Sequence, residues 1–132
     1  MLELRHISKT FYPGTVHEKT ALQDLSLTLQ TGDFVTILGS NGAGKSTLFN
    51  AVAGGFAVDS GRIVLDGQEL TGMPDYKRSK FIGRMFQDPM RGTAANMEIQ
   101  ENLAMALRRG KSRGLGWGIK KNEKDFYREA LA

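Results

Sequence analysis

The stretch Gly39-Ser40-Asn41-Gly42-Ala43-Gly44-Lys45-Ser46 matches the pattern G-x-x-x-x-G-K-[ST] at every fixed position. Its glycines let the chain curl tightly, so that successive main-chain N–H groups can point at one anion. Residues 34–38 before it are rich in β-formers and predict a strand buried on both faces. Residues 45–52 after it predict a helix whose N-terminus faces the same anion. This context favours a phosphate-binding loop over a plain glycine-rich turn.

Two side chains of the loop add chemistry to the main-chain cradle. Lys45 can reach the β- and γ-phosphates of a nucleotide as a point charge. The hydroxyl of Ser46 is placed to ligate a Mg²⁺ ion that bridges those phosphates. The sequence therefore predicts a site for Mg²⁺ and the phosphates of ATP.

Hydrophobic periodicity predicts the remaining elements. Strands are expected at residues 2–7, 22–29, 63–65 and 82–86, and helices at residues 75–81, 98–109 and 125–132. Gly54 and Gly55 are expected to end the helix after the loop. Asp66-Gly67 is a strong hairpin-turn signal.

Composition excludes several classes of protein. The 132 residues include no cysteine, so a disulfide framework or a thiolate metal site is excluded, and two histidines are too few for a convincing metal cluster. No window approaches 18 uninterrupted apolar residues, and the N-terminus does not resemble a signal peptide. The net charge of +4 is moderate and does not by itself imply nucleic acid. We expect a soluble, cytosolic protein.

Further motifs identify a family that the chain resembles. Residues 39–47 closely resemble the Walker A sequence of ABC-transporter ATPases. Residues 60–67 resemble the glycine, strand and Asp-Gly hairpin of that family, residues 82–89 its approach to the Q-loop, and residues 101–103 the start of its helical subdomain. These motifs occur in the order of the family and cover essentially the whole chain.

The resemblance implies an α/β fold, a P-loop NTPase with a RecA-like core and an antiparallel β subdomain. It also implies that the fold is incomplete in this chain. Residues 1–97 would form the N-terminal half of the ATPase core, as far as the Q-loop, and residues 98–132 the start of the helical subdomain.

The resemblance also implies roles for individual residues. The triphosphate would be held by Gly39, Ser40, Asn41, Gly42, Ala43, Gly44, Lys45, Ser46 and Thr47. Gln87 resembles the Q-loop glutamine, which contacts Mg²⁺ and the hydrolytic water; the alternative is a polar residue at a strand end. Phe11 or Tyr12 would stack on adenine, with spacing favouring Phe11, although each could be an ordinary exposed turn aromatic.

Other parts expected of the family are missing from the sequence. The chain has no Leu-Ser-Gly-Gly-Gln signature, no Walker B sequence after Gln87 and no histidine after the loop. We therefore expect negligible ATP hydrolysis by this polypeptide alone, because no carboxylate positions the water. The strand at residues 34–38 would also have unpaired edges. We expect the chain to associate with itself, to swap segments or to be part of a longer protein.

The resemblance implies the ATP-binding subunit of a bacterial-type ABC transporter, an importer, that hydrolyses ATP in its full-length form. Its partners would be a transmembrane permease and a second ATP-binding subunit in a homodimer, with no direct contact to nucleic acid. It would lie in the cytoplasm, on the inner face of the membrane through the permease. The alternatives are a soluble ABC ATPase acting on nucleic acid or ribosomes, and a bare nucleotide-binding module.

A basic connector occupies the second half of the chain. It comprises Arg108, Arg109, Lys111, Arg113, Lys120, Lys121 and Lys124. It could contact anionic lipid, nucleic acid or a transmembrane subunit, or be a solvated loop, which its glycines favour. Trp117 within it could anchor a partner or pack inside the loop.

Overall fold

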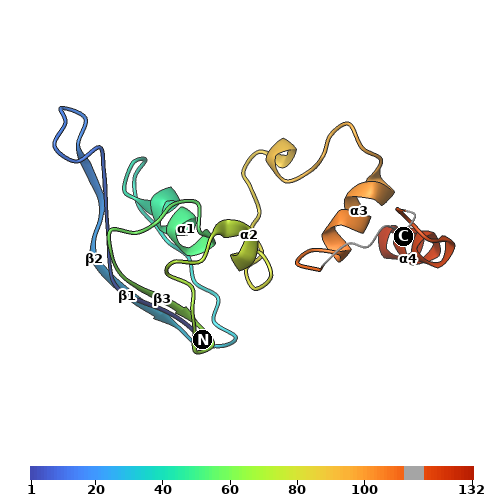
Figure 1. Ribbon diagram of the computed structural model, residues 1–132, viewed down its shortest axis with the longest axis horizontal. Helices are drawn as coiled ribbons and strands as arrows, with labels where there is room; N and C mark the ends of the chain where they lie inside the picture. Colours follow the sequence, from blue (N-terminus) through green and yellow to red (C-terminus); the bar gives the residue numbers. More distant parts are fainter. Residues whose placement is uncertain (112–117) are drawn as a thin grey trace. The chain divides into compact units, whose positions relative to one another are not determined.

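The computed structural model describes residues 1–111 and 118–132 (Figure 1). The chain forms two compact units, Met1–Arg78 and Ser79–Ala132. Arg113 and Trp117, two residues of the basic connector, lie outside the described residues. Each unit is described by itself.

The first unit is built on an antiparallel sheet with the strand order β2-β1-β3-β4. Its strands are β1 (Leu2–Phe11), β2 (Lys19–Leu29), β3 (Ser60–Leu65) and β4 (Gln68–Glu69). Leu4 of β1 stands opposite Leu27 of β2 and Ile63 of β3, so the apolar positions of three strands meet. The strands predicted at residues 2–7, 22–29 and 63–65 are confirmed, and each extends beyond its predicted bounds.

The turn between β3 and β4 has the predicted hairpin form. Asp66 and Gly67 have φ angles of 48° and 80°, and Leu65 pairs with Gln68 across them. Two successive residues with positive φ match the right-handed twist of the flanking strands, which explains the Asp-Gly pair.

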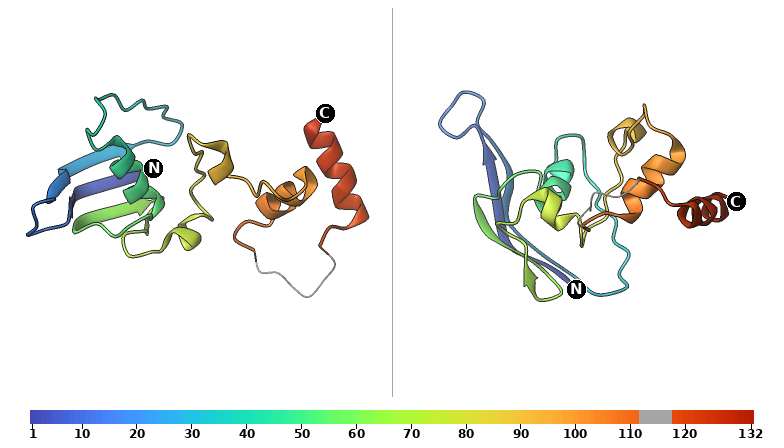
Figure 2. Two further views of the ribbon diagram at one scale, coloured as in Figure 1. Left: turned by 90° about the horizontal axis from the view of Figure 1, so that it is seen from above. Right: turned by 45° about the vertical axis from the view of Figure 1, so that its right-hand side comes forward.

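Helix α1 (Lys45–Ala53) lies against one face of the sheet (Figure 2). Leu48 and Ala51 are its buried residues. They belong to a core that also contains Leu4, Ile7, Leu22, Ile63 and Leu70. Gly54 has a φ of 86°, and the N–H of Gly55 donates to the carbonyl of Asn50 at 2.8 Å, so the helix ends where the glycine pair predicts.

Arg78 ties the far end of α1 to the chain that follows it. Its guanidinium donates to the carbonyls of Ala51 (2.7 Å) and Val52 (2.9 Å) at the C-terminus of α1. It also donates to the carbonyls of Met73 (2.7 Å) and Thr71 (2.9 Å). Arg78 is only 2% exposed, and this burial lowers the pKa of its guanidinium. A positive charge at this helix end is favoured by the helix dipole.

Helix α2 (Asp75–Arg78) ends at this arginine. The helix predicted over residues 75–81 is therefore shorter than expected. The last residues of that prediction, 79–81, belong to the second unit.

Two predicted strands are absent. Residues 34–38 and 82–86 form no strand, and Phe34 and Leu38 are 96% and 87% exposed. Their β-forming side chains suit a buried strand, but a strand also needs a neighbour to complete its hydrogen bonds. In the part of the chain that the structure describes, no strand pairs with either segment. Local propensity alone therefore gave the wrong prediction at both places.

The second unit contains a short 3₁₀ turn, η1 (Pro89–Arg91), and helices α3 (Ile99–Leu107) and α4 (Lys121–Leu131). The helices predicted at residues 98–109 and 125–132 are confirmed, but α4 begins four residues early. Its start is fixed by the main-chain N–H of Lys120, which donates to the Glu123 carboxylate at 2.8 Å. Among the described residues, no helix has the length and apolar character needed to cross a membrane.

Polar contacts hold the second unit together around few buried side chains. Arg108 at the end of α3 donates two hydrogen bonds to the Glu123 carboxylate of α4, at 2.8 and 3.0 Å. The hydrogen bond from the Lys120 N–H, followed by those from Arg108, lowers the pKa of the Glu123 carboxyl. Asn102 of α3 accepts from the N–H of Ala94 at 2.8 Å and donates to its carbonyl at 3.1 Å, which fixes the segment before the helix.

Candidate nucleotide-binding site

The glycine-rich loop has a backbone that requires glycine at two positions. Gly42 and Gly44 have φ angles of 84° and 86°, in the left-handed region that other residues rarely adopt. A Cβ on Gly44 would also lie 2.5 Å from the carbonyl oxygen of Ala21 in β2. Close approach of the loop to β2 and its left-handed turn therefore both exclude a larger residue at Gly44.

The side chain of Lys45 folds back over the loop. Its ammonium donates hydrogen bonds to the main-chain carbonyls of Gly39 and of Ser40, the latter at 2.7 Å. The positive charge therefore lies within the curve of the loop, where the sequence predicts that it meets phosphate.

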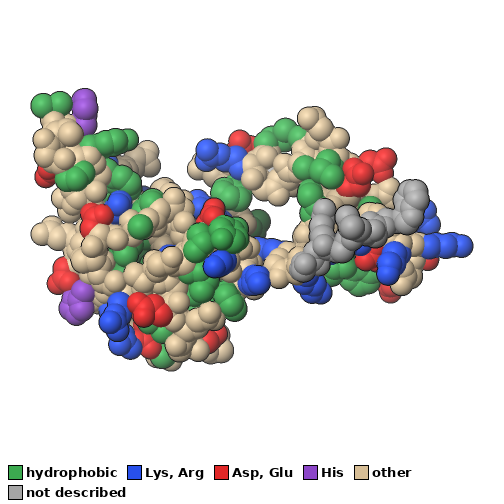
Figure 3. Space-filling view, viewed as in Figure 1, with side chains coloured by type: hydrophobic (Ala, Val, Ile, Leu, Met, Phe, Trp, Pro, Cys, Tyr) green, Lys and Arg blue, Asp and Glu red, His purple; other side chains and the backbone are tan. Residues whose placement is uncertain are grey.

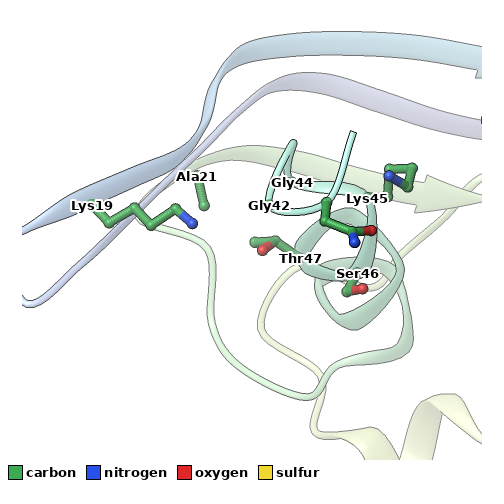
Figure 4. A pocket seen from close by; sticks show the side chains of 8 residues that line it. Lys19, Ala21, Gly42, Gly44, Lys45, Ser46 and Thr47 are labelled. Atoms are coloured by element: carbon green, nitrogen blue, oxygen red, sulfur yellow. The ribbon is translucent and has the colours of Figure 1, made fainter. Parts of the chain in front are cut away.

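A small pocket of about 150 Å³ opens in front of the loop and the first turn of α1 (Figure 4). It is lined by Lys19, Ala21, Asn41, Gly42, Gly44, Lys45, Ser46 and Thr47. The first turn of α1 has no acidic residue and no capping side chain. Its main-chain N–H groups and the positive end of the helix dipole thus face the pocket uncompensated, which favours an anion there.

The structure brings most of the predicted loop residues to this pocket. Asn41, Gly42, Gly44, Lys45, Ser46 and Thr47 line it. Gly39 and Ser40 provide the carbonyls that hold Lys45, and Ala43 closes the turn through a hydrogen bond from its N–H to Ser40. Gln87 lies exposed in the second unit, after the segment where a strand was predicted.

The two candidate aromatic residues have different surroundings. The Phe11 ring, at the end of β1, meets the Phe56 ring edge to face at 5.3 Å between centroids. The Lys9 ammonium lies 5.5 Å from the centroids of both rings. Tyr12 begins the following turn with a φ of 52° and is 68% exposed. Phe11 is thus fixed by packing, whereas the Tyr12 ring is open to solvent.

Two features near the site were missed by the sequence analysis. Lys19 and Ala21 of β2 line the pocket, although residues 22–38 lie between them and the loop in sequence. Asp59 accepts hydrogen bonds from the N–H of Thr10 (2.7 Å) and the ammonium of Lys9 (2.9 Å), which lower the pKa of its carboxyl. No local motif marks these residues, because the pairing of the strands brings them together.

The basic connector is partly engaged in contacts within the chain. Arg108 pairs with Glu123, and Arg109 donates to the carbonyl of Ile82. Lys and Arg side chains are visible on the surface around α4 in Figure 3. These contacts assign a structural role to Arg108 and Arg109. A contact of the other basic residues with anionic lipid, nucleic acid or a transmembrane subunit stays a prediction.

The sequence profile of the ABC transporter family matches residues 22–131. The chain belongs to this family. The matched segment includes the glycine-rich loop, α1 and both helices of the second unit, whereas β1 and the pocket residues Lys19 and Ala21 precede it.

Curated ABC transporter proteins with similar sequences include transport and import subunits. A tyrosine transport ATP-binding protein of Clostridioides difficile is 42% identical over 84% of this chain and 44% of its own length. A spermidine/putrescine import ATP-binding protein, PotA, of Haemophilus influenzae is 40% identical over 82% of the chain and 27% of its own length. A methionine import ATP-binding protein, MetN, of Corynebacterium efficiens is 38% identical over 78% of this chain and 31% of its own length. The chain thus spans less than half the length of these relatives.

Solved ABC cassettes share the fold of the chain. A dimeric bacterial ABC transporter cassette matches with a TM-score of 0.77 and 27% identity over 99% of this chain and 56% of its own. The same cassette as a dimer in a post-hydrolysis state, bound to ADP and Pi, matches with a TM-score of 0.76. The predicted fold class, a P-loop ATPase fold present in part, is confirmed.

Proposed function

We propose that this chain binds Mg-ATP through residues 39–47 and is the nucleotide-binding part of an ABC transporter ATPase. The observation that carries the proposal is the loop itself. Its two left-handed glycines, its central lysine and an uncapped helix N-terminus all face one pocket. A family member bound to ADP and Pi supports a nucleotide as the ligand.

Each residue of the site has a proposed role. The main-chain N–H groups of residues 39–47 and the Lys45 ammonium would hold the β- and γ-phosphates. Phe11 or Tyr12 would stack on adenine through a ring face. Gly44 supports the fit of a phosphate. No side chain has room at this position, so the main chain itself lines the pocket there.

Mg²⁺ would be held by the hydroxyl of Ser46 and the side-chain amide oxygen of Gln87. Both are oxygen ligands, which suit this ion, and Ser46 lines the pocket. When bound, the ion would neutralise charge on the phosphate oxygens. The proposed catalytic residues are accordingly Lys45, through electrostatics, and Gln87, through positioning of water.

The whole protein would be the ATP-binding subunit of a bacterial-type importer. The names of similar proteins, for tyrosine transport, spermidine/putrescine import and methionine import, support this proposal. It would work with a transmembrane permease and a second ATP-binding subunit, at the cytoplasmic face of the membrane. A dimeric cassette among the structural matches supports the paired arrangement. Within it, residues 1–97 would supply half of the ATPase core and residues 98–132 the first part of the helical subdomain.

ATP hydrolysis by the 132-residue chain alone should be negligible. Its sequence contains neither a Walker B sequence after Gln87 nor a Leu-Ser-Gly-Gly-Gln signature. Without a carboxylate to position water, phosphate binding does not lead to turnover. A phosphate-release assay at saturating ATP tests this, and turnover that depends on Lys45 would contradict it.

Equilibrium titration with Mg-ATP tests the binding proposal. We expect Lys45→Ala to weaken binding at least about tenfold, since it removes a charge-assisted contact to phosphate. Lys77→Ala is the matched control, because Lys77 is an exposed lysine of the same unit outside the pocket. Equal affinities of the unaltered chain and Lys45→Ala for Mg-ATP would contradict the proposal. An equal loss of Mg-ATP affinity in Lys77→Ala would contradict it too.

A further inference from the structure

Lys19 is a second cation at the pocket. It is the first residue of β2 and lines the pocket from the side opposite α1, whose first residue is Lys45 (Figure 4). Its ammonium lies 3.7 Å from the position that a Cβ on Gly42 would occupy. The side chain therefore reaches the phosphate-binding loop from a different strand.

The charge of Lys19 is not neutralised within the described part of the chain. No ion pair or hydrogen bond joins its ammonium to another described residue, and no acidic side chain lines the pocket. Lys9, on the neighbouring strand, differs in this respect, because its ammonium pairs with Asp59 at 2.9 Å. Two lysines without a carboxylate around one small pocket favour an anionic ligand with more than one charge.

The strand register gives Lys19 a defined place along a bound nucleotide. Lys19 stands directly opposite Phe11 in the β1–β2 ladder. It therefore lies between the candidate aromatic platform and the glycine-rich loop, whereas Lys45 lies within the loop itself. In a nucleotide that extends from the aromatic residue to the loop, the phosphate next to the ribose occupies the interval between them.

We propose that Lys19 binds the α-phosphate end of the nucleotide, as a second phosphate-directed residue in addition to Lys45. This inference rests on the proposed function, since it assigns a residue to the same site. It makes Lys19 a determinant of affinity for nucleoside phosphates over nucleosides. Lysine suits the role, because its flexible stem delivers a compact charge and three donors.

The test compares Lys19→Met with the unaltered chain in titrations with ATP, ADP and adenosine. We expect the variant to lose about five- to tenfold in affinity for both ATP and ADP, which share the α-phosphate, and nothing for adenosine. Lys19→Arg should retain most of the affinity, because it keeps the charge. Lys77→Met, which removes an exposed lysine outside the pocket, should change none of the three.

Salt dependence gives a second readout that a merely structural role would not change. Removal of one phosphate contact should reduce the loss of ATP affinity with increasing salt. Unchanged ATP affinity in Lys19→Met, or an equal loss for adenosine, would overturn the assignment. If Lys45→Ala weakens ATP binding while Lys19→Met does not, only this inference fails. If the unaltered chain binds no ATP, the proposed function fails and this inference with it.

Discussion

The two units of the chain are held together in different ways. In the first unit, strands far apart in sequence pair into one sheet, and α1 packs on it through Leu48 and Ala51. In the second unit, the buried hydrophobic side chains among the described residues are Ala104 and Tyr127, and polar contacts at Arg108 and Asn102 connect its segments. The glycine-rich loop is therefore attached to the unit with the larger core.

This difference has a consequence for function. A binding loop needs a rigid support to keep its N–H groups aimed at one ligand. A unit with few buried contacts unfolds locally at a lower free-energy cost, as is common in segments that change position during function. We therefore expect unfolding of the second unit at lower denaturant concentration than the first.

The largest effect is expected at Arg78, which anchors α1 in the first unit. Arg78→Met would leave the carbonyls of Ala51, Val52, Met73 and Thr71 without their buried donor. We expect a loss of about 3 kcal/mol in the free energy of unfolding, measured by urea denaturation followed by circular dichroism. Arg78→Lys should lose less, because it keeps the charge and some of the donors. A loss below about 0.5 kcal/mol for Arg78→Met, the range of surface substitutions, would contradict the anchoring role.

A smaller effect is expected at Gly44, with Gly14 as its matched control. Both have positive φ, of 86° and 74°, but only at Gly44 would a Cβ meet main-chain atoms. Gly14→Ala should destabilise the chain by about 1 kcal/mol through backbone conformation alone. Gly44→Ala should cost about 2 kcal/mol or more and should also weaken ATP binding. Thermal unfolding with and without ATP measures both, and equal behaviour of the two variants would argue against close packing of the loop on β2.

The exposed segment at residues 34–38 gives a prediction about association. Phe34 and Leu38 expose large apolar side chains, and such surfaces tend to bind one another. We expect the chain to self-associate in a concentration-dependent way, and Phe34→Ser with Leu38→Ser to reduce this association. Val16→Ser, which alters an equally exposed residue of a separate turn, should leave it unchanged. A monodisperse monomer in light scattering for the unaltered chain would refute the expectation.

The smallest effect is expected at Glu123 in the second unit. Its pKa is lowered by hydrogen bonds from Lys120 and Arg108, so the folded unit favours the ionised carboxylate. The resulting stability is complete above the ordinary pKa of glutamate and is lost as the pH falls through the lowered value. Protection of the α4 amides against hydrogen exchange, relative to their intrinsic exchange rates at each pH, should therefore fall in acid. Glu123→Gln should remove this pH dependence, whereas Glu129→Gln, which alters an exposed residue of the same helix, should retain it. Identical pH profiles of the two variants would disprove the link between Glu123 ionisation and the stability of α4.

The sequence was sufficient where local geometry decides the structure. The Asp66-Gly67 turn, the end of α1 at Gly54 and the loop before Lys45 each depend on a backbone that glycine or a short polar residue adopts. The β1 and β2 strands followed from their alternating apolar residues. The loop and the helix that follows it were thus predictable because their determinants are adjacent in the chain.

The sequence was insufficient where distant segments decide the outcome. Residues 34–38 have strong β-forming side chains, yet no described strand completes their hydrogen bonds. Lys19 reaches the pocket only because β2 pairs with β1 and passes beside Gly44. No local motif marks Arg78 as buried, and its hydrogen bonds to carbonyls at the end of α1 form only when the elements pack. Such contacts require the pairing of elements to be known.

The most direct test of the central claim is amide NMR mapping of the full chain titrated with Mg-ATP. Main-chain N–H groups that wrap a triphosphate should show the largest shifts at residues 42–47, with smaller changes at Lys19 and Phe11. The same titration of Lys45→Ala should give these shifts only at much higher ATP concentration. Shifts confined to residues outside the loop, or a response of Lys45→Ala equal to that of the unaltered chain, would contradict the account.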